Sequence, residues 1–254
     1  MLSSLGSFYL DSSRHLQCIG IDNVMPNLTP LIGRFHDDNR ASNNDRTHDA
    51  NLRRNAATLL VTCSDASFSP NTVTQSEPDD YYILRSVGNI VPPHASRLDN
   101  TKKLGGDEAL SIVAALEYAV TFLRIARVIV CGHSDCAVME QLLNPTRLAP
   151  QPNTNRWLAH TNVDYRLAEL DRDAIHDDRQ RLDAVVEENV LVQMANLMSH
   201  PFIANAVAHK KLEIVGWTYR TDSNKLLAWE QARLKFVPME RTVRPAKVSP
   251  KQVA

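Results

Sequence analysis

The sequence predicts an α/β fold: a mainly parallel central β-sheet flanked by helices, with an N-terminal helical arm. Two short apolar runs, Thr58 to Thr62 and Arg127 to Cys131, are typical of buried strands. Between them, Asp107 to Arg124 carries apolar residues at helical spacing. Buried strands that alternate with amphipathic helices favour a parallel sheet covered by helices on both faces.

The length of 254 residues suits one large domain or two small ones. We divide the chain into an arm at residues 1–50, an α/β domain at 51–230, and a basic, proline-containing tail at 231–254. The hydrophobic fraction of 43% and the charged fraction of 22% are ordinary for a soluble globular protein.

Charge and hydropathy exclude several classes of partner. The net charge of −1 gives no electrostatic reason to expect binding to nucleic acid or to an anionic membrane. No apolar run approaches the roughly 20 residues that span a bilayer. The N-terminus has no basic segment before its short apolar stretch, so we expect a cytoplasmic protein without a secretory signal. The Ser-rich start with Arg14 leaves a mitochondrial location as the alternative.

The first half of the domain should alternate strands and helices. After the strand at Thr58–Thr62 we expect a polar loop to Asp80, and the remaining elements are a strand at Tyr81–Ser86, a helix at Asp107–Arg124, a strand at Arg127–Cys131 and a helix at Ala137–Leu143. Prolines at 145, 150 and 152 predict a loop from 144 to 156.

The second half should add helices and a hairpin. We expect helical structure from Trp157, a helix from Asp177 to Met198 that His200-Pro201 ends, and a short helix to Ala208. Leu212–Tyr219 and Lys225–Trp229 predict two strands joined by a tight turn. The tail from Gln231 holds six basic residues and three prolines, which favours a solvated or subunit-wrapping segment.

Candidate metal ligands follow the first and third predicted strands. Cys63 and Asp65 come directly after one strand, and His133 and Cys136 after the other. The carboxyl ends of parallel strands gather ligands at one edge of a sheet. Two thiolates and an imidazole suit zinc, and a catalytic zinc keeps three protein ligands. By spacing alone, Cys63 and Cys136 can equally be buried thiols, and Asp65 can lie on the metal or beside it.

Four cysteines in a long chain without an export signal favour reduced thiols over disulfides. Cys131 lies within an apolar run, so we interpret it as a small core residue. Cys18 has no partner pattern.

The motifs, taken together, resemble the β-class carbonic anhydrase family. Cys63-x-Asp65, Arg85-x-x-Gly88-Asn89, Glu117-Tyr-Ala-Val120 and Gly132-His133-x-x-Cys136 match family patterns in order, and the likeness covers roughly residues 55 to 230. The resemblance implies one Zn²⁺ per subunit on Cys63, His133 and Cys136, and reversible hydration of CO₂ to bicarbonate. It also implies a homodimer or a tetramer built as a dimer of dimers.

The chain departs from the family pattern at a residue beside the metal motif. The family arginine of Cys-x-Asp-x-Arg, which keeps the Asp65 carboxylate off the zinc, is Ser67 here. By this resemblance we expect Asp65 to be the catalytic hydrogen-bond acceptor, and it is also the candidate fourth zinc ligand of a closed state. Arg85 is a candidate substitute holder of Asp65, Gly88 is a candidate pocket residue, and Arg54 or Asn55 stands where the family has a substrate-binding Gln.

Three functions therefore remain open at this point. The first is a carbonic anhydrase with low or pH-gated activity. The second is a hydrolase of a CO₂ analogue such as carbonyl sulfide or carbon disulfide. The third is a zinc-binding pseudoenzyme of the same fold, which the missing arginine at Ser67 favours.

Overall fold

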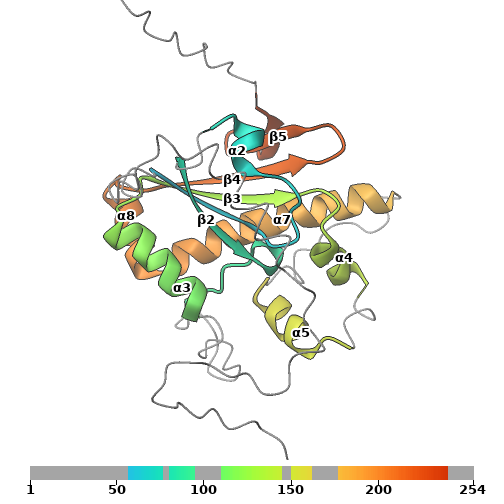
Figure 1. The fold of residues 1–254 in the computed structure, drawn as a ribbon, viewed down its shortest axis with the longest axis horizontal. Coiled ribbons are helices and arrows are strands. Elements are labelled where there is room, and N and C mark those ends of the chain that lie inside the picture. The colour runs from blue at the N-terminus through green and yellow to red at the C-terminus, as the bar shows by residue number, and fades with distance from the viewer. Residues whose placement is uncertain (1–56, 77–79, 95–109, 145–149, 162–176, 240–254) are drawn as a thin grey trace, which may run out of the picture. The chain divides into compact units, whose positions relative to one another are not determined.

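The central sheet has six strands in the order β2-β1-β3-β4-β5-β6 (Figure 1). The structure is a computed structural model that describes residues 57–76, 80–94, 110–144, 150–161 and 177–239. The strands are β1 (Thr58–Cys63), β2 (Tyr81–Ser86), β3 (Arg127–His133), β4 (Glu213–Arg220), β5 (Lys225–Glu230) and β6 (Lys235–Pro238). Strands β1 to β4 pair in parallel, whereas β5 and β6 are antiparallel, which confirms the mainly parallel α/β fold.

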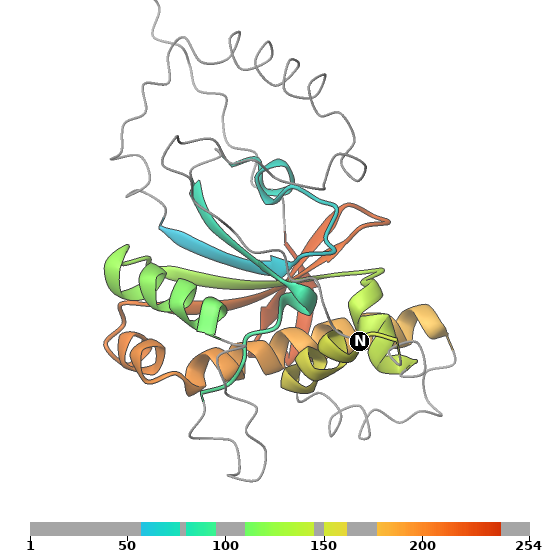
Figure 2. The same ribbon diagram turned by 60° about the horizontal axis from the view of Figure 1, so that its bottom comes forward.

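Helices lie on both faces of the sheet. They are α2 (Pro70–Thr74), α3 (Leu110–Glu117), α4 (Ala137–Leu143), α5 (Pro152–Leu158), α7 (Asp178–Ser199) and α8 (Pro201–Ala208). Figure 2 shows α7 and α8 below the sheet and α2 above it. The apolar core agrees, because Leu59 and Val61 of β1 pack with residues of α3, α7 and α8. Leu60 of the same strand packs towards Phe68 and Val73 on the α2 side.

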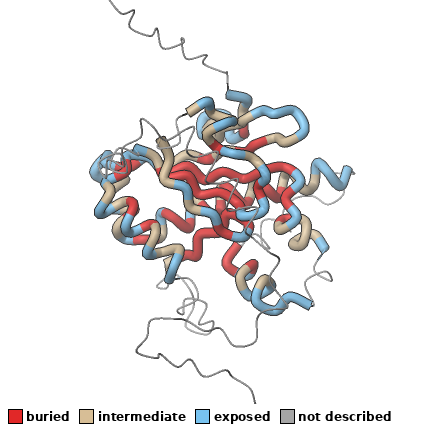
Figure 3. Tube along the Cα trace, viewed as in Figure 1, coloured by how far each residue is buried: buried red, intermediate tan, exposed pale blue. Residues whose placement is uncertain are grey.

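Strands β1 and β3 form the centre of the molecule. Every residue of β1 after Thr58, and every residue of β3 after Arg127, is buried. Figure 3 shows this concentration of buried residues in the central strands. Runs of Leu, Val and Ile that are covered on both faces are typical of inner parallel strands. Cys131 belongs to the core on the α2 side, as the sequence predicts.

Helix α7 lies close against β3 and β4. The Asp177 carboxylate caps its first turn by accepting a hydrogen bond from the Arg179 N–H. The helix passes near Gly132 of β3, where an added Cβ would lie 2.8 Å from Val186 Cγ1. The absence of a side chain at Gly132 therefore allows the helix to approach the strand that carries His133.

Several local predictions differ from the structure. Residues 152–158 form α5 although three prolines predict a loop, because Pro152 occupies the first helical turn, where its missing N–H costs nothing. The short helix α2 lies within the predicted polar loop before Asp80 for the same reason at Pro70. The predicted helix to Arg124 ends in a π-helical turn at Tyr118–Phe122.

The sheet also extends past the predicted boundary at residue 230. Strand β6 pairs with β5, so residues 235–238 of the predicted tail belong to the sheet. The predicted arm at 1–50, the helix start at Asp107 and the tail from residue 240 lie outside the described residues. Within the part of the chain that is described, no helix is both long and apolar enough to cross a bilayer.

Candidate metal centre

The structure brings Cys63, His133 and Cys136 together at the carboxyl edge of the sheet. One ligand atom from each lies within 4.8 Å of the others, and all three side chains are buried. Cys63 ends β1, His133 ends β3, and Cys136 directly precedes α4. Since β1 and β3 are paired neighbours, two segments about 70 residues apart in sequence meet at this point.

The His133 ring is oriented to present one nitrogen to the two sulfurs. Its Nδ1 hydrogen bonds with the Ser134 carbonyl at 2.9 Å; since the carbonyl can only accept, Nδ1 carries the proton. In the neutral ring Nε2 is then the acceptor, and it is buried without a hydrogen-bond partner. An unpaired buried nitrogen beside two thiols is the arrangement that a bound metal ion would satisfy.

The two thiols differ in protonation. The hydrogen bond from Cys136, with the sulfurs 3.8 Å apart, lowers the pKa of Cys63 to about 4 against the effect of burial. The N–H groups of Asp65 and Gly88 also donate to the Cys63 sulfur, each at 3.3 Å. The hydrogen bond between the two sulfurs, together with burial, raises the pKa of Cys136. The pair therefore gives up one of its two protons more easily than an isolated buried thiol would, and a metal ion would displace the other.

The charge of the Cys63 thiolate also acts on His133. Burial opposes the imidazolium form, but the interaction with the Cys63 thiolate raises the pKa of His133 above its usual value. Two sulfurs and one imidazole within reach of a single ion form a donor set that suits zinc. The residues therefore fit the metal that the sequence predicts.

Asp65 lies on the exposed side of this group. Its Oδ2 accepts a hydrogen bond of 3.0 Å from the Ala137 N–H, at the start of α4. Among the described residues, the set whose ligand atoms lie within 4.8 Å of one another consists of Cys63, His133 and Cys136, without Asp65. In this structure the carboxylate is thus held beside the three-residue group.

Arg85 holds the backbone around Asp65 rather than its carboxylate. Its guanidinium donates to the carbonyl oxygens of Cys63, Ala66 and Phe68 at 2.9 to 3.1 Å. These bonds occupy the fork of the guanidinium, so the predicted role as a direct holder of Asp65 is not what the structure has. Ser67 is exposed on the loop that Arg85 fixes. Arg54 and Asn55 lie outside the described residues.

Buried polar residues of α7 support the segment that carries Gly88. The Asn189 amide donates to the Gly88 carbonyl at 3.0 Å, and Gln193 accepts from the Val91 N–H at 2.9 Å. Asn196 donates to the Val91 carbonyl. The sequence shows Asn189 and Asn196 on one helical face with Val185 and Val192, but that pattern alone does not say which backbone they hold.

The comparisons with known proteins all point to one family. The sequence profile of the carbonic anhydrase family matches residues 58–226. The carbonic anhydrase of Synechocystis sp. is 32% identical over 214 residues, which are 84% of this chain and 74% of the relative. The carbonic anhydrase of Pseudomonas aeruginosa is 33% identical over 181 residues, 71% of this chain and 76% of the relative.

Solved structures show the same fold. The β-carbonic anhydrase CcaA superposes with a TM-score of 0.70 at 30% identity, covering 85% of this chain and 92% of its own. One of two tetrameric β-carbonic anhydrases from Sordaria macrospora superposes with a TM-score of 0.64 at 24% identity, covering 79% and 94%. At that identity the second likeness supports the fold alone.

Proposed function

The chain belongs to the β-class carbonic anhydrase family, and on this premise we propose that it is a zinc enzyme that hydrates CO₂ reversibly to bicarbonate. The observation that carries the proposal is the convergence of Cys63, His133 and Cys136, which would hold one zinc ion per subunit. A zinc ion bound there would act as a Lewis acid that activates water near neutral pH, an effect for which carbonic anhydrases with three histidine ligands are the standard example.

In this proposal Asp65 is the catalytic hydrogen-bond acceptor. It is exposed, and its carboxylate accepts a hydrogen bond from the Ala137 N–H next to the three ligands. Two thiolates offset the formal charge of a divalent ion, so the metal would be a weaker Lewis acid than one held by neutral imidazoles. A carboxylate that orients the attacking water by accepting a hydrogen bond from it therefore contributes more here.

Ser67 makes the position of Asp65 less secure. The Ala137 N–H is a single neutral donor, whereas a guanidinium at position 67 could form two charge-assisted hydrogen bonds with the carboxylate. In the zinc-loaded protein, Asp65 could therefore leave the Ala137 N–H and become a fourth ligand that excludes water. Hydroxide competes better with a carboxylate as the pH rises, so the activity should be low near neutral pH and rise with pH.

We also propose that the protein is a cytoplasmic homodimer or a dimer of dimers. The apolar surface of α3 and the turn after it supports association with a second copy, because Leu110 and Phe122 are 61% and 68% exposed.

The test is stopped-flow CO₂ hydration from pH 6.5 to 9, on protein whose zinc content is measured. We expect zinc-dependent activity that rises with pH. The Ser67→Arg variant should be faster, mainly at the low end of this range, because loss of one preorganised partner commonly costs on the order of 10² to 10³ in rate. Ser69→Arg, on the same exposed loop, is the matched control and should behave as the wild type.

The outcome decides between the proposed function and its alternatives. A zinc-loaded protein that is inactive at every pH, and that Ser67→Arg does not rescue, contradicts the carbonic anhydrase proposal. Turnover of carbonyl sulfide or carbon disulfide by that protein would then indicate the hydrolase. Inactivity on all three substrates would indicate the pseudoenzyme, which the serine at position 67 favours.

A further inference from the structure

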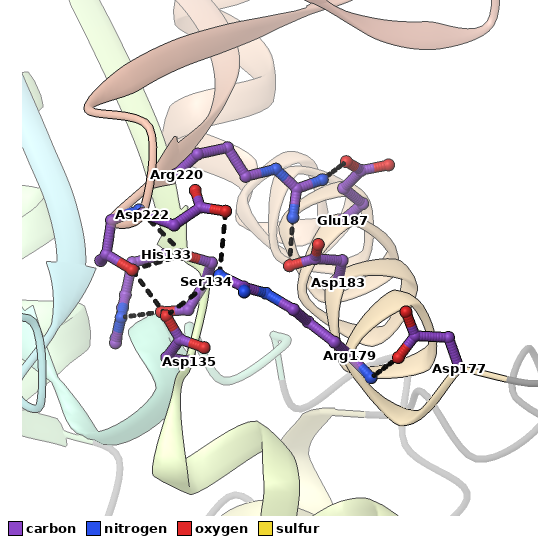
Figure 4. Close-up of polar contacts among 10 residues, drawn as sticks. His133, Ser134, Asp135, Asp177, Arg179, Asp183, Glu187, Arg220 and Asp222 are labelled. Atoms are coloured by element: carbon purple, nitrogen blue, oxygen red, sulfur yellow. Dashed lines mark hydrogen bonds and ion pairs between the residues drawn. The ribbon is translucent and has the colours of Figure 1, made fainter.

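A polar cluster lies beside His133 and is not part of the ligand set. It joins three elements: Ser134 and Asp135 after β3, the first turns of α7, and residues 220–222 at the end of β4 (Figure 4). The side chains of Arg179, Asp183 and Glu187 reach it from α7. None of these residues offers a ligand atom to the group of Cys63, His133 and Cys136, so the role of the cluster must be a different one.

The hydrogen bonds of Thr221 have a defined direction. Its hydroxyl lies 2.6 Å from Asp135 Oδ2 and 2.8 Å from the Ser134 hydroxyl. Since an ionised carboxylate can only accept, the Thr221 hydroxyl donates to Asp135, and the Ser134 hydroxyl donates to Thr221. The Thr221 N–H in turn donates to Ser134 Oγ at 2.9 Å. Thr221 therefore holds both Ser134 and Asp135.

The two residues that Thr221 holds determine the orientation of the His133 ring. The Ser134 carbonyl accepts the Nδ1 proton of His133, which leaves Nε2 directed at the sulfurs. Asp135 has a φ of +56°, in the left-handed region that is strained for residues other than glycine. Without the hydrogen bonds from Thr221, the peptide between Ser134 and Asp135 would relax more easily. The Ser134 carbonyl, which accepts the His133 proton, would move with this peptide.

Helix α7 fixes Thr221 by contacting the residues on either side of it, Arg220 and Asp222. Arg220 forms ion pairs with Asp183 and Glu187, and its side chain is only 19% exposed. Arg179 contacts Asp222 at 2.9 Å and Asp135 at 4.0 Å, but its side chain is 51% exposed. Because solvent screens exposed pairs, the Arg220 contacts should contribute more to fixing this strand end than the Arg179 contacts.

We propose that Thr221 is a positioning residue for the metal centre: its hydroxyl, anchored to α7 through Arg220, holds the Ser134–Asp135 peptide that orients His133. The inference rests on the proposed role of His133 as a zinc ligand. Loss of the direct hydrogen-bond partner of a metal ligand, here the Ser134 carbonyl, typically changes metal affinity by about 10- to 100-fold. Thr221 acts through that partner, so we expect an effect at the lower end of this range.

The experiment measures how fast the fully zinc-loaded protein transfers zinc to an excess of chelator. Thr221→Val keeps the side-chain size but removes the hydroxyl, and it should release zinc about tenfold faster than the wild type. Thr221→Ser keeps the hydroxyl and should release zinc at nearly the wild-type rate. Thr74→Val is the matched control, because it removes a hydroxyl that hydrogen bonds within α2 and its neighbouring turn.

A second variant guards against misfolding of the first. Asp135→Asn keeps a residue that tolerates positive φ but replaces the charged acceptor of the Thr221 hydroxyl by a weaker, neutral one, so it should also release zinc faster, by a smaller factor than Thr221→Val. Unfolding of the zinc-free proteins is measured in parallel, so that a general loss of stability is recognised. Wild-type release rates in Thr221→Val or, if that variant does not fold, in Asp135→Asn overturn the inference. So does a Thr221→Ser variant as fast as Thr221→Val.

The two proposals fail in different ways. A wild-type protein that does not retain zinc at all overturns the proposed function and this inference with it. A wild type that retains zinc and hydrates CO₂, with a Thr221→Val variant that releases zinc no faster, overturns the inference alone.

Discussion

Gly88 connects the backbone of the β2 turn to the Cys63 thiolate. Its φ is +70°, and its N–H donates to the Cys63 sulfur at 3.3 Å. An added Cβ would lie 2.8 Å from Met139 Cε and 3.1 Å from Val138 Cγ1, both on α4. A side chain at this position would therefore strain the backbone and press against the helix that follows Cys136.

We expect Gly88→Ala to lower the free energy of unfolding of the zinc-free protein by about 1 to 3 kcal/mol, the usual cost of a left-handed conformation in a residue other than glycine. Denaturant unfolding measures this. Val87→Ala, at the exposed neighbouring residue, is the control and should change stability by about 0.5 kcal/mol or less. Equal stabilities of the two variants would show that the contacts at Gly88 are not restrictive.

At the scale of residues, the sequence predicts which residues form the candidate site better than it predicts which atoms they contact. Cys63, His133 and Cys136 follow apolar runs, and the parallel pairing of those runs brings them together. The Ala137 N–H bond to Asp65 was not predictable in the same way, because it depends on the path of two loops. Arg85 illustrates the same limit: its position in a motif indicates importance, but not that it donates to three carbonyl oxygens.

Helix α7 combines the roles of core element and polar scaffold. Asn189, Gln193, Asn196 and His200 follow one another at intervals of four, three and four residues, which places them on one face. Their side chains bond the backbone of residues 88–92, and His200 Nε2 donates to the Pro92 carbonyl at 2.9 Å. This face therefore fixes the segment that begins at Gly88.

His200 should make the stability of this element dependent on pH. Burial lowers the pKa of His200 below its usual value, and the nearby His94 adds to this against the opposing effect of the Pro92 bond. The unfolded chain thus binds the proton more readily than the folded one. The stability that the neutral His200 ring contributes is fully present above pH 6.5, which is about the pKa of histidine in the unfolded chain. It is lost as the pH falls through the lower pKa that His200 has in the folded protein.

The test compares the wild type with His200→Gln, whose amide can still donate to the Pro92 carbonyl. Between pH 7 and pH 5, the free energy of unfolding should fall more steeply in the wild type than in the variant. His209→Gln is the control, because His209 is exposed at the end of α8 and should leave the wild-type slope unchanged. Parallel slopes for wild type and His200→Gln would contradict the role of His200.

At the scale of elements, the two helices that the sequence analysis missed, α2 and α5, share one physical cause. Proline breaks a helix in its interior, but it is favourable in the first turn, and Pro70, Pro152 and Pro201 all stand there. The sequence predicts a helix start at Pro201 because Pro201 directly follows the end of a long predicted helix. Pro152 has no such neighbour, so a loop was the simpler interpretation. Strand β6 was missed because a four-residue edge strand carries too few residues for periodicity to be seen.

Taken over the whole molecule, the candidate metal centre joins elements that are distant in sequence. Cys63 ends β1 in the first part of the domain, and His133 and Cys136 enclose the turn between β3 and α4. Helix α7 packs on β3 and β4, and its charged side chains reach the turn through residues 220–222. A metal ion at this point would cross-link segments that separate when the protein unfolds. Loss of the ion should therefore lower the stability of the whole folded region.

The last prediction follows from this arrangement. A ligand that binds only the folded state stabilises it by about 2.7 kcal/mol at a free concentration of 100 times its Kd. For a folded region of this size, roughly 2 to 4 °C of thermal midpoint correspond to each kcal/mol. Stripping zinc should therefore lower the midpoint by about 5 to 10 °C, and restoring zinc should raise it again. Cys136→Ser removes one proposed ligand, so the thermal midpoint of this variant should respond much less to zinc. Cys131→Ser is the control, because the Cys131 thiol lies in the core on the α2 side. Its midpoint should start lower but keep the full response to zinc. A wild-type midpoint that is independent of zinc, or an equal response in Cys136→Ser, would mean that the three residues do not hold the metal in the folded protein.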